Sequence, residues 1–205
     1  MKLNSLKAKL TLYSVVLILF TTIPIIGTVA YLVSNSFYNS YQKNISQQFD
    51  MIDHTLNLFY EDLDRNIDMF ADSLMLKSAD STITSYVDKE GVMRTASTNG
   101  GIEQEIYEAF LNYADSHPGT LYVYMGTEDG GYIQWPESTN TKKYDPRVRP
   151  WYRSAMASQG RIIRTNPYAD IETGTLIVSN ARTYTDKSGK IYGVMAIDVS
   201  SGKLT

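Results

Sequence analysis

The N-terminal part of the chain is apolar and uncharged over a long stretch. No side chain from Leu10 to Gln42 carries a charge, and the residues from Leu10 to about Val33 are mostly hydrophobic. About 24 helical residues span roughly 36 Å at 1.5 Å per residue, which is enough to cross the ~30 Å hydrocarbon core of a bilayer. The pattern predicts a transmembrane helix over residues 10–33, preceded by a short tip, residues 1–9.

The charges beside this segment predict its orientation. Lys2, Lys7 and Lys9 precede it, and no charged residue follows before Lys43. Lysine and arginine gather on the cytoplasmic side of membrane helices, so the tip is predicted in the cytoplasm and everything after residue 34 outside. A cleaved signal peptide is the rival interpretation, but its apolar region has only about 7–15 residues. The longer segment here favours an uncleaved anchor.

A helical pattern follows the apolar segment. Hydrophobic residues recur every three or four positions from Ile45 to Leu74, and neither proline nor glycine occurs between Ser36 and Ser78. This spacing is typical of one face of a helix, and we predict a long stalk helix over residues 34–79. The hydrophobic stripe either packs against its own domain or forms a dimer seam. We expect both, with a homodimer contact near the membrane and domain packing farther out.

From Asp80 on, the pattern changes to the turns and short strands of a globular domain. An amphipathic pattern predicts a helix over residues 101–116, and a proline at a first helical position predicts a short one over residues 150–158. Runs of β-forming residues predict four strands, at residues 121–126, 132–135, 176–184 and 191–199. Strands joined by turns favour an antiparallel sheet with helices packed on one side, an α+β fold.

Composition and charge argue against several classes of function. Beyond the three lysines of the tip, the chain has 16 basic and 22 acidic residues, and this net charge of −6 argues against a nucleic-acid partner. There is no cysteine, and His54 and His117 lie far apart in sequence, so neither a metal site nor another cofactor is expected. The phosphate-loop, nucleophile-elbow and metalloprotease motifs are absent as well. We therefore do not expect an enzyme.

One short segment has an unusual composition. Tyr144–Tyr152 holds two arginines, two prolines and three aromatic residues. Proline fixes the backbone, and an arginine held in this way can receive a carboxylate through two parallel hydrogen bonds. The structural alternative is that Arg147 and Arg149 form salt bridges while Trp151 lies in the core. The residues alone leave both interpretations open.

Three segments together resemble a known family. They are Tyr144–Tyr152 with its Asp-Pro-Arg-x-Arg-Pro-Trp-Tyr string, Asn166–Asp170, and Gly189–Val199 with its Gly-Val-x-Ala-x-Asp ending. The chain resembles the double Cache family of extracellular sensor domains, which occurs mostly in bacterial methyl-accepting chemotaxis receptors and also in sensor kinases and cyclic-dinucleotide enzymes. The resemblance implies a membrane-distal, PAS-like Cache module over residues 80–205 and a location in the bacterial cytoplasmic (inner) membrane.

One subgroup of this family recognises free amino acids, and the resemblance implies which residues do so here. Three positions correspond to those that hold the ligand carboxylate: Tyr144, Arg149 and Trp151. Three others correspond to those that hold the ligand ammonium: Tyr168, Asp170 and Asp198. Pairing both charges makes physical sense, because a charge that is desolvated and left unpaired costs several kcal/mol.

The resemblance does not identify the pocket for the ligand side chain. Tyr122, Tyr124 and Trp135, on the two early strands, are candidates for its wall. Tyr152 belongs either to that wall or to the core, and we interpret Arg147 as structural.

The family normally continues into a membrane-proximal module, a second transmembrane helix and a cytoplasmic output region. This sequence stops at Thr205, shortly after the last predicted strand. It is therefore predicted to be an N-terminal piece of a receptor that reaches its cytoplasmic signalling partners through the missing part. Three other interpretations stay open: a histidine kinase or diguanylate cyclase sensor that binds an organic acid, amine or purine; an anchored extracytoplasmic enzyme; and a structural or adhesive surface protein.

Overall fold

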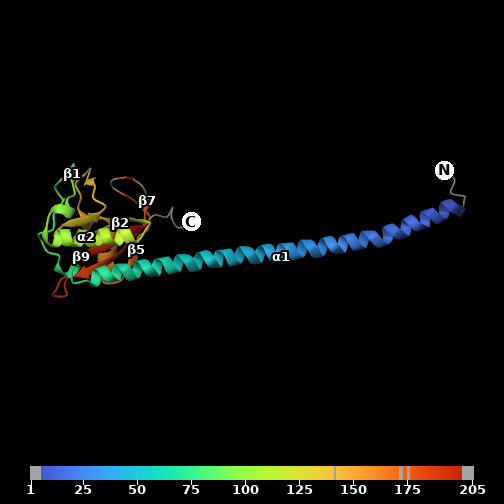
Figure 1. Cartoon of the computed structure of the whole chain (residues 1–205), viewed down its shortest axis with the longest axis horizontal. Helices are drawn as coiled ribbons and strands as arrows, with labels where there is room; N and C mark the ends of the chain where they lie inside the picture. Colours follow the sequence, from blue (N-terminus) through green and yellow to red (C-terminus); the bar gives the residue numbers. More distant parts are fainter. Residues whose placement is uncertain (1–5, 141, 171–172, 175, 200–205) are drawn as a thin grey trace. The chain divides into compact units, whose positions relative to one another are not determined.

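The computed structural model describes residues 6–140, 142–170, 173–174 and 176–199. The chain forms two compact units, which divide between Thr55 and Leu56. Figure 1 labels the helices and strands in their order along the chain. Residues 1–5 of the predicted tip, and residues 200–205 after the last strand, lie outside the described part.

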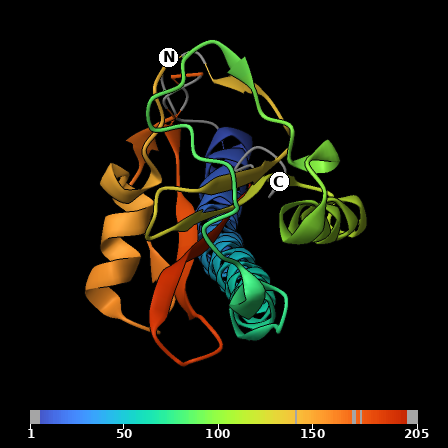
Figure 2. The ribbon, with the colours of Figure 1, turned by 90° about the vertical axis from the view of Figure 1, so that its left-hand side faces the viewer.

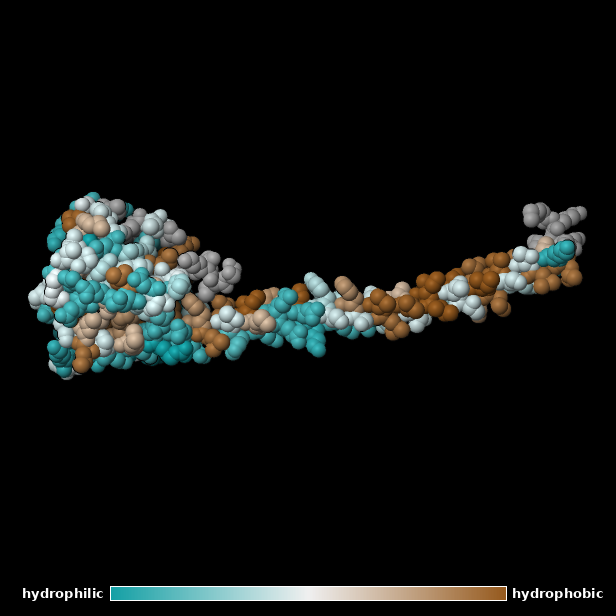
Figure 3. Space-filling model, in the orientation of Figure 1, coloured by the Kyte–Doolittle hydropathy of each residue, from teal (hydrophilic) through white to brown (hydrophobic). Residues whose placement is uncertain are grey.

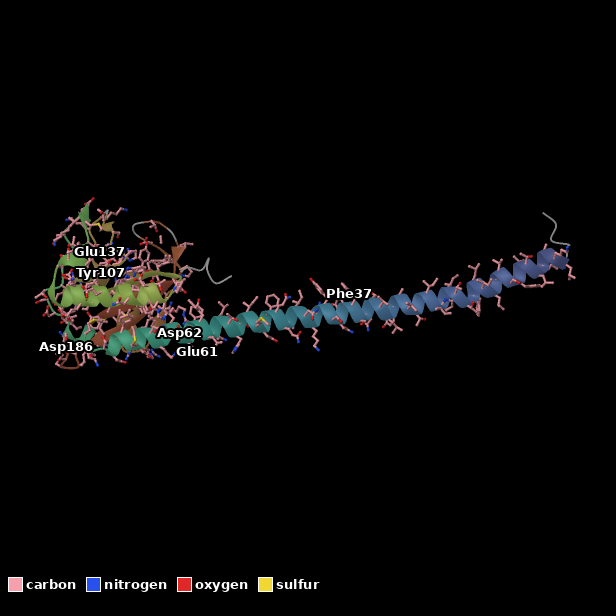
Figure 4. All side chains as sticks on the ribbon, in the orientation of Figure 1. Phe37, Glu61, Asp62, Tyr107, Glu137 and Asp186 are labelled. Carbon is pink, nitrogen blue, oxygen red and sulfur yellow. The ribbon has the colours of Figure 1, made fainter. Side chains whose placement is uncertain are left out.

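Helix α1 (Leu6–Asp72) is continuous (Figure 1). Nearly all of its described side chains in the first unit are exposed, and Phe37 stands out from it with 73% of its surface exposed (Figure 4). An 18-residue window of this helix reaches a mean hydropathy of 2.3, and hydrophobic surface gathers along it (Figure 3). By length and composition, the helix is able to cross a membrane.

The observed end of this helix differs from the predicted one. No break separates the predicted transmembrane and stalk segments, and Pro24 lies inside the helix. The Thr28 hydroxyl donates a hydrogen bond of 2.7 Å to the Pro24 carbonyl. The helix ends at Asp72 and not near residue 79, and a short 3₁₀ helix, η1 (Leu76–Ser78), follows it.

The second unit is built on a five-stranded antiparallel sheet. Its strands, in spatial order, are β3 (Tyr132–Trp135), β2 (Thr120–Thr127), β9 (Ile191–Val199), β8 (Ser179–Thr185) and β5 (Ile163–Arg164). Two pairs of short strands lie outside this sheet: β1 (Val92–Met93) with β4 (Thr139–Asn140), and β6 (Tyr168–Ala169) with β7 (Leu176–Ile177). The last strand of the chain, β9, is central and is buried along most of its length.

The two faces of the sheet belong to two separate cores. Side chains alternate between the faces along a strand, so Met125 belongs to one core and Tyr124 to the other. Helix α2 (Gly101–Ser116) and the end of α1 cover the first face, and α3 (Pro150–Ser158) covers the second (Figure 2). The expectation that all helices pack on one side is therefore wrong for α3. An amphipathic pattern shows which side of a helix is buried, and not which face of a sheet it covers.

The strand predicted over residues 176–184 is two strands in two different sheets. Strand β7 ends at Ile177 and pairs with β6, whereas β8 begins at Ser179 and pairs with β9. Strands β6 and β7, which we call the β6–β7 hairpin, thus pair outside the main sheet, directly before β8.

Ion pairs join the last turns of α1 to the edge of the sheet. Arg182 of β8 pairs with Asp68 and Asp72 at 3.0 and 2.8 Å. Arg164 of β5 pairs with Asp64 at 3.4 Å. The acidic side chains of α1 therefore lie opposite the basic side chains of strands β5 and β8.

Candidate ligand-binding site

A small cavity lies on the face of the sheet that α3 covers. Its volume is about 20 Å³, room for about one water molecule. Strands β2, β3 and β9, the start of α3, the segment before it and the β6–β7 hairpin supply its walls. The lining residues are Tyr122, Tyr124, Tyr132, Gln134, Tyr144, Arg149, Trp151, Tyr168, Asp170, Ile177 and Asp198.

Asp198 is a buried carboxyl group in the middle of the sheet. It lies on β9, between Tyr122 of β2 and Ser179 of β8. The residue is 2% exposed, and its Oδ1 accepts a hydrogen bond of 2.8 Å from the Tyr124 hydroxyl. Burial raises the pKa of Asp198 to about 7, although hydrogen bonds from Ser179 and Tyr124 act in the opposite direction. A cation beside this carboxyl would favour its charged form.

A network of hydroxyl groups surrounds this carboxyl. The Ser179 Oγ lies 2.7 Å from the Tyr124 hydroxyl and 2.7 Å from the Tyr168 hydroxyl. Burial, followed by the charge of Asp198, raises the pKa of both tyrosines above their ordinary value. The two phenols therefore keep their protons at neutral pH, and the network offers oxygen atoms with which an ammonium group can form hydrogen bonds.

Arg149 is the cation of the cavity. It lies between the short helix η3 (Pro146–Val148) and Pro150, the first residue of α3, so prolines fix the backbone on both sides. Its guanidinium carbon is 5.9 Å from the ring centroids of Tyr144 and Tyr168. Its Nε is buried and has no hydrogen-bond partner within the described part of the chain. Such a donor costs about 1–3 kcal/mol, a cost that an anion at this position would remove.

Arg147 is two positions earlier and points elsewhere. It pairs with Asp145 at 2.9 Å and donates a hydrogen bond of 3.3 Å to the Glu128 carbonyl. Its side chain is 41% exposed, and it is not among the residues that line the cavity. These contacts agree with a structural role for Arg147.

Aromatic rings form a rigid wall beside the two charged groups. Trp151 is 1% exposed, and its ring meets that of Tyr124 edge to face, with centroids 4.9 Å apart. The rings of Tyr132 and Tyr144 have centroids 4.4 Å apart. Aromatic pairs at these distances are attractive beyond the area that they bury, so this wall has little freedom to rearrange.

Asp170 reaches the cavity from the loop of the β6–β7 hairpin. Its Oδ2 accepts hydrogen bonds from the backbone nitrogen and the hydroxyl of Thr173, at 3.1 and 2.7 Å. Tyr168 and Ile177, from the two strands of the hairpin, line the cavity as well. This short element thus supplies three of the lining residues.

The cavity brings together residues that are far apart in sequence. All six residues implied by the resemblance line it, as do Tyr122 and Tyr124. Trp135 and Tyr152 do not. Trp135 packs against the core on the α2 side of the sheet, and Tyr152 lies in the α3-side core with its ring 5.5 Å from that of Trp151.

Among the described residues, sequence reasoning missed three that line the cavity: Tyr132, Gln134 and Ile177. A signal for two of them was present. On paired antiparallel strands, residues directly opposite share a face, and Gln134 lies opposite Tyr124 whereas Trp135 lies opposite Val123. Alternation along β3 therefore indicates Tyr132 and Gln134 in place of Trp135. No pattern in the sequence indicated that Ile177 turns back over the cavity.

An antiparallel sheet with helices on both faces and a polar cavity on one of them is a PAS-like arrangement. Residues 101–205 match the family described as methyl-accepting chemotaxis protein-like, first PDC sensor domain. The chain belongs to this family.

The curated relatives are chemotaxis proteins. The chain is 34% identical over 115 residues to the methyl-accepting chemotaxis protein McpB of Bacillus subtilis (strain 168), a match that covers 56% of this chain and 17% of McpB. It is 25% identical over 179 residues to TlpB of the same organism, covering 85% of this chain and 24% of TlpB. The chain thus spans about a sixth to a quarter of the length of these relatives.

Solved structures with this fold are chemoreceptor domains. One is the ligand-binding domain of the Pseudomonas aeruginosa PAO1 amino acid chemoreceptor PctC, in complex with GABA (TM-score 0.53, 21% identity, 75% of this chain and 59% of that one). Another is that of Campylobacter jejuni chemoreceptor Tlp3 with 4-methylisoleucine (TM-score 0.53, 19% identity, 80% and 61%). At these identities the similarity establishes the fold alone.

Proposed function

We propose that this chain is the extracytoplasmic sensing part of a methyl-accepting chemotaxis receptor and that it binds a small amino-acid-type ligand without catalysing a reaction. One observation carries this proposal. A single cavity is lined by Arg149, whose buried Nε has no hydrogen-bond partner in the described residues, and by the carboxyl groups of Asp170 and Asp198. This set of charges is complementary to a molecule with one carboxylate and one ammonium group.

The lining residues divide into two groups by the charge that they can accommodate. Arg149 would hold the carboxylate, beside the rings of Tyr144 and Trp151. Asp198 and Asp170 would hold the ammonium, together with the hydroxyl of Tyr168. Each charge leaves water on binding, and the loss is offset only when both are paired. A simple acid or a simple amine would leave one group of the site without its partner.

Binding requires the cavity to change its shape, because about 20 Å³ is room for one water molecule and an amino acid is several times larger. Strands β6 and β7 have two residues each and, within the described part of the chain, pair with one another outside the main sheet. We propose that this hairpin moves outward to admit the ligand and then returns.

The rest of the proposal concerns the membrane. Residues 10–33 would span the cytoplasmic membrane with the N-terminus inside, as the exposed, apolar part of α1 and the lysines before it suggest. The stripe on the following part of α1 would form a homodimer contact. Ligand binding would favour one arrangement of the domain, and α1 would transmit this preference across the membrane.

A thermal-unfolding screen tests the ligand class. The full chain in detergent micelles would be unfolded, with tryptophan fluorescence as the signal, in the presence of each protein amino acid and of organic acids, amines and purines. A ligand at about 100 times its dissociation constant adds about 2.7 kcal/mol of stability. We expect an amino acid to raise the melting temperature of the wild-type chain, and both Arg149→Ala and Asp198→Ala to abolish the shift.

Arg147→Ala is the matched control, because Arg147 belongs to the same segment and does not line the cavity. It should keep the full shift. A response to organic acids that depends on Arg149 alone, or to amines that depends on Asp198 alone, would contradict the amino-acid proposal. A response to purines alone would contradict the two-charge site.

A further inference from the structure

Arg94 is a second arginine close to the cavity, and it is not one of the lining residues. It follows strand β1 directly and is 1% exposed. Its backbone nitrogen donates a hydrogen bond of 3.1 Å to the Ser138 carbonyl, and its Nη1 donates one to the Ser138 hydroxyl. A guanidinium keeps its proton in a protein. The domain therefore contains a permanent positive charge in its interior.

Three tyrosine rings surround this charge. The guanidinium carbon of Arg94 lies 5.2 Å from the ring centroid of Tyr132, 5.4 Å from that of Tyr144 and 6.0 Å from that of Tyr86. A cation within about 6 Å of an aromatic face is attracted by the ring quadrupole, and the attraction is strongest where water is excluded. We call these three rings the Arg94 cage.

Two of the three cage rings are also part of the cavity wall. Tyr132 and Tyr144 line the cavity, and their ring centroids are 4.4 Å apart. Tyr144 also lies 5.9 Å from the guanidinium carbon of Arg149. Tyr86 belongs to the same core but does not line the cavity. The Arg94 cage and the cavity wall thus share two rings.

We infer that Arg94 is a positioning residue of the ligand site, holding the Tyr132 and Tyr144 rings in the orientation in which they face the cavity. The inference rests on the proposed function for the class of ligand. A purely structural Arg94 would stabilise the domain and leave the affinity of the folded protein unchanged. A positioning role makes the affinity depend on the charge at residue 94.

Binding measurements on the full chain in detergent micelles separate these two roles. The probe is the protein amino acid that gives the largest thermal shift with the wild-type chain. Arg94→Met keeps most of the side-chain volume and removes the charge. It should weaken binding about tenfold, because the two rings would then hold the binding orientation in only about a tenth of the molecules. Arg94→Lys restores the charge and should recover the affinity to within about threefold.

The control is Ile106→Ala, which creates a defect in the core on the α2 side of the sheet. It should lower the melting temperature and leave the affinity unchanged. Wild-type affinity in Arg94→Met would overturn the inference. So would equal weakening in Arg94→Met and Ile106→Ala, or a lysine variant that binds no better than the methionine variant.

A second pair of variants serves if Arg94→Met does not fold. Tyr86→Leu removes one ring of the cage without changing a lining residue, whereas Tyr86→Phe keeps the ring. The leucine variant should bind about threefold more weakly than the phenylalanine variant. Equal affinities of these two variants would overturn the inference.

A measurement without ligand distinguishes failure of this inference from failure of the proposed function. With 3-fluorotyrosine incorporated, fluorine NMR reports the ring motions of Tyr132 and Tyr144. Both rings should move faster in Arg94→Met than in the wild-type chain, and unchanged motion would contradict a positioning role. If they do move faster but the wild-type chain binds no amino acid, the ligand class is wrong and the role of Arg94 stands.

Discussion

The Tyr124 hydroxyl lies 2.8 Å from Oδ1 of Asp198, to which it donates its single proton. It also lies 2.7 Å from the Ser179 Oγ, which in turn lies 2.7 Å from the Tyr168 hydroxyl. These hydroxyl groups can each donate and accept hydrogen bonds, so Asp198, Tyr124, Ser179 and Tyr168 form one connected network. An ionised Asp198 fixes the direction of the Tyr124 proton, and the oxygen atoms of the network can accept hydrogen bonds from an ammonium group.

Tyr124→Phe should weaken amino-acid binding about tenfold, because it removes the donor to Asp198 and breaks the oriented network. A hydrogen bond to a charged group contributes about 1.5–3 kcal/mol. Titration calorimetry with the wild-type and variant chains measures this loss. Tyr152→Phe is the control, since Tyr152 lies in the same core and does not line the cavity. Equal affinities in the two variants would show that the network has no part in binding.

Amino-acid binding should strengthen as the pH rises through about 7, the pKa of the buried Asp198 carboxyl. Only the ionised carboxylate attracts an ammonium group. The stability of the ligand-free chain should respond in the opposite direction. The folded-state pKa lies above the ordinary value of about 4. Between these two values the folded chain binds more protons than the unfolded chain, so its free energy of unfolding falls as the pH rises from about 4 to about 7.

Asp198→Asn tests both parts of this pH prediction. The variant should lose amino-acid binding, and its melting temperature without ligand should decline less as the pH rises from about 4 to about 7, the window set by the two pKa values. Asp88→Asn is a suitable control, because the Asp88 side chain is 90% exposed. A decline of equal size in Asp198→Asn and the wild-type chain would mean that Asp198 does not titrate in this range.

Gly126→Ala should reduce both stability and affinity. A Cβ atom at Gly126 would lie 2.6 Å from Cβ of Pro146, at the start of the segment that carries Arg149. Overpacking of this kind costs about 1–3 kcal/mol, and the displaced segment would move Arg149 away from the cavity. Gly160→Ala, at a position with open space around it, should leave the affinity unchanged, although its positive φ of 76° makes some strain unavoidable. Calorimetry and thermal unfolding would measure the two effects separately.

Arg182→Met should destabilise the second unit by about 1 kcal/mol at neutral pH, through loss of the pairs with Asp68 and Asp72. The hydrogen bond from Arg182 holds the pKa of Asp72 below its ordinary value. The Arg182–Asp72 ion pair therefore contributes to the free energy of unfolding at neutral pH, and this contribution is lost as the pH falls below about 4. Urea unfolding at pH 7 and pH 3 should show a difference between variant and wild type that shrinks in acid. A difference of the same size at both pH values would assign the effect to packing.

Single cysteines on the hydrophobic stripe of α1 test the proposed homodimer, and the natural chain has no cysteine to interfere. Phe49→Cys and Leu56→Cys should form disulfide-linked dimers under mild oxidation in membranes. His54→Cys, between them in sequence and on the opposite side of the helix, should form far fewer. Absence of cross-linked dimers at both stripe positions would contradict this seam.

Periodic patterns explain why much of the fold could be predicted from the sequence. The three-to-four spacing up to Leu74, and the runs of β-forming residues on either side of the turn at residues 128–131, have direct physical causes in helices and sheets. The face of the sheet that α3 covers could not be predicted, because it depends on which long-range contacts close the domain. The same limit applies to the break after Ile177, where a continuous run of strand-forming residues divides between two sheets.

The sequence predicted the arginine side of the candidate site better than the side formed by strand β3. The Tyr144–Tyr152 segment is conspicuous because charge, proline and aromatic residues are concentrated in it. Gln134 carries no such signal, and only its register opposite Tyr124 reveals it. Trp135 was predicted to line the cavity because it is aromatic. Successive side chains of a strand point to opposite faces of the sheet, and this alternation determines which of them faces the cavity.

The β6–β7 hairpin has a consequence for timing. Its residues Tyr168, Asp170 and Ile177 would both recognise the ligand and cover it. An interaction that strengthens ligand binding at these positions would also hold the hairpin closed. Tighter binding would therefore appear mainly as a lower dissociation rate. A swimming cell compares ligand concentrations at successive times. A receptor that releases its ligand too slowly would still be occupied after the concentration has fallen. Response speed would then set an upper limit on how strongly this hairpin can hold its ligand.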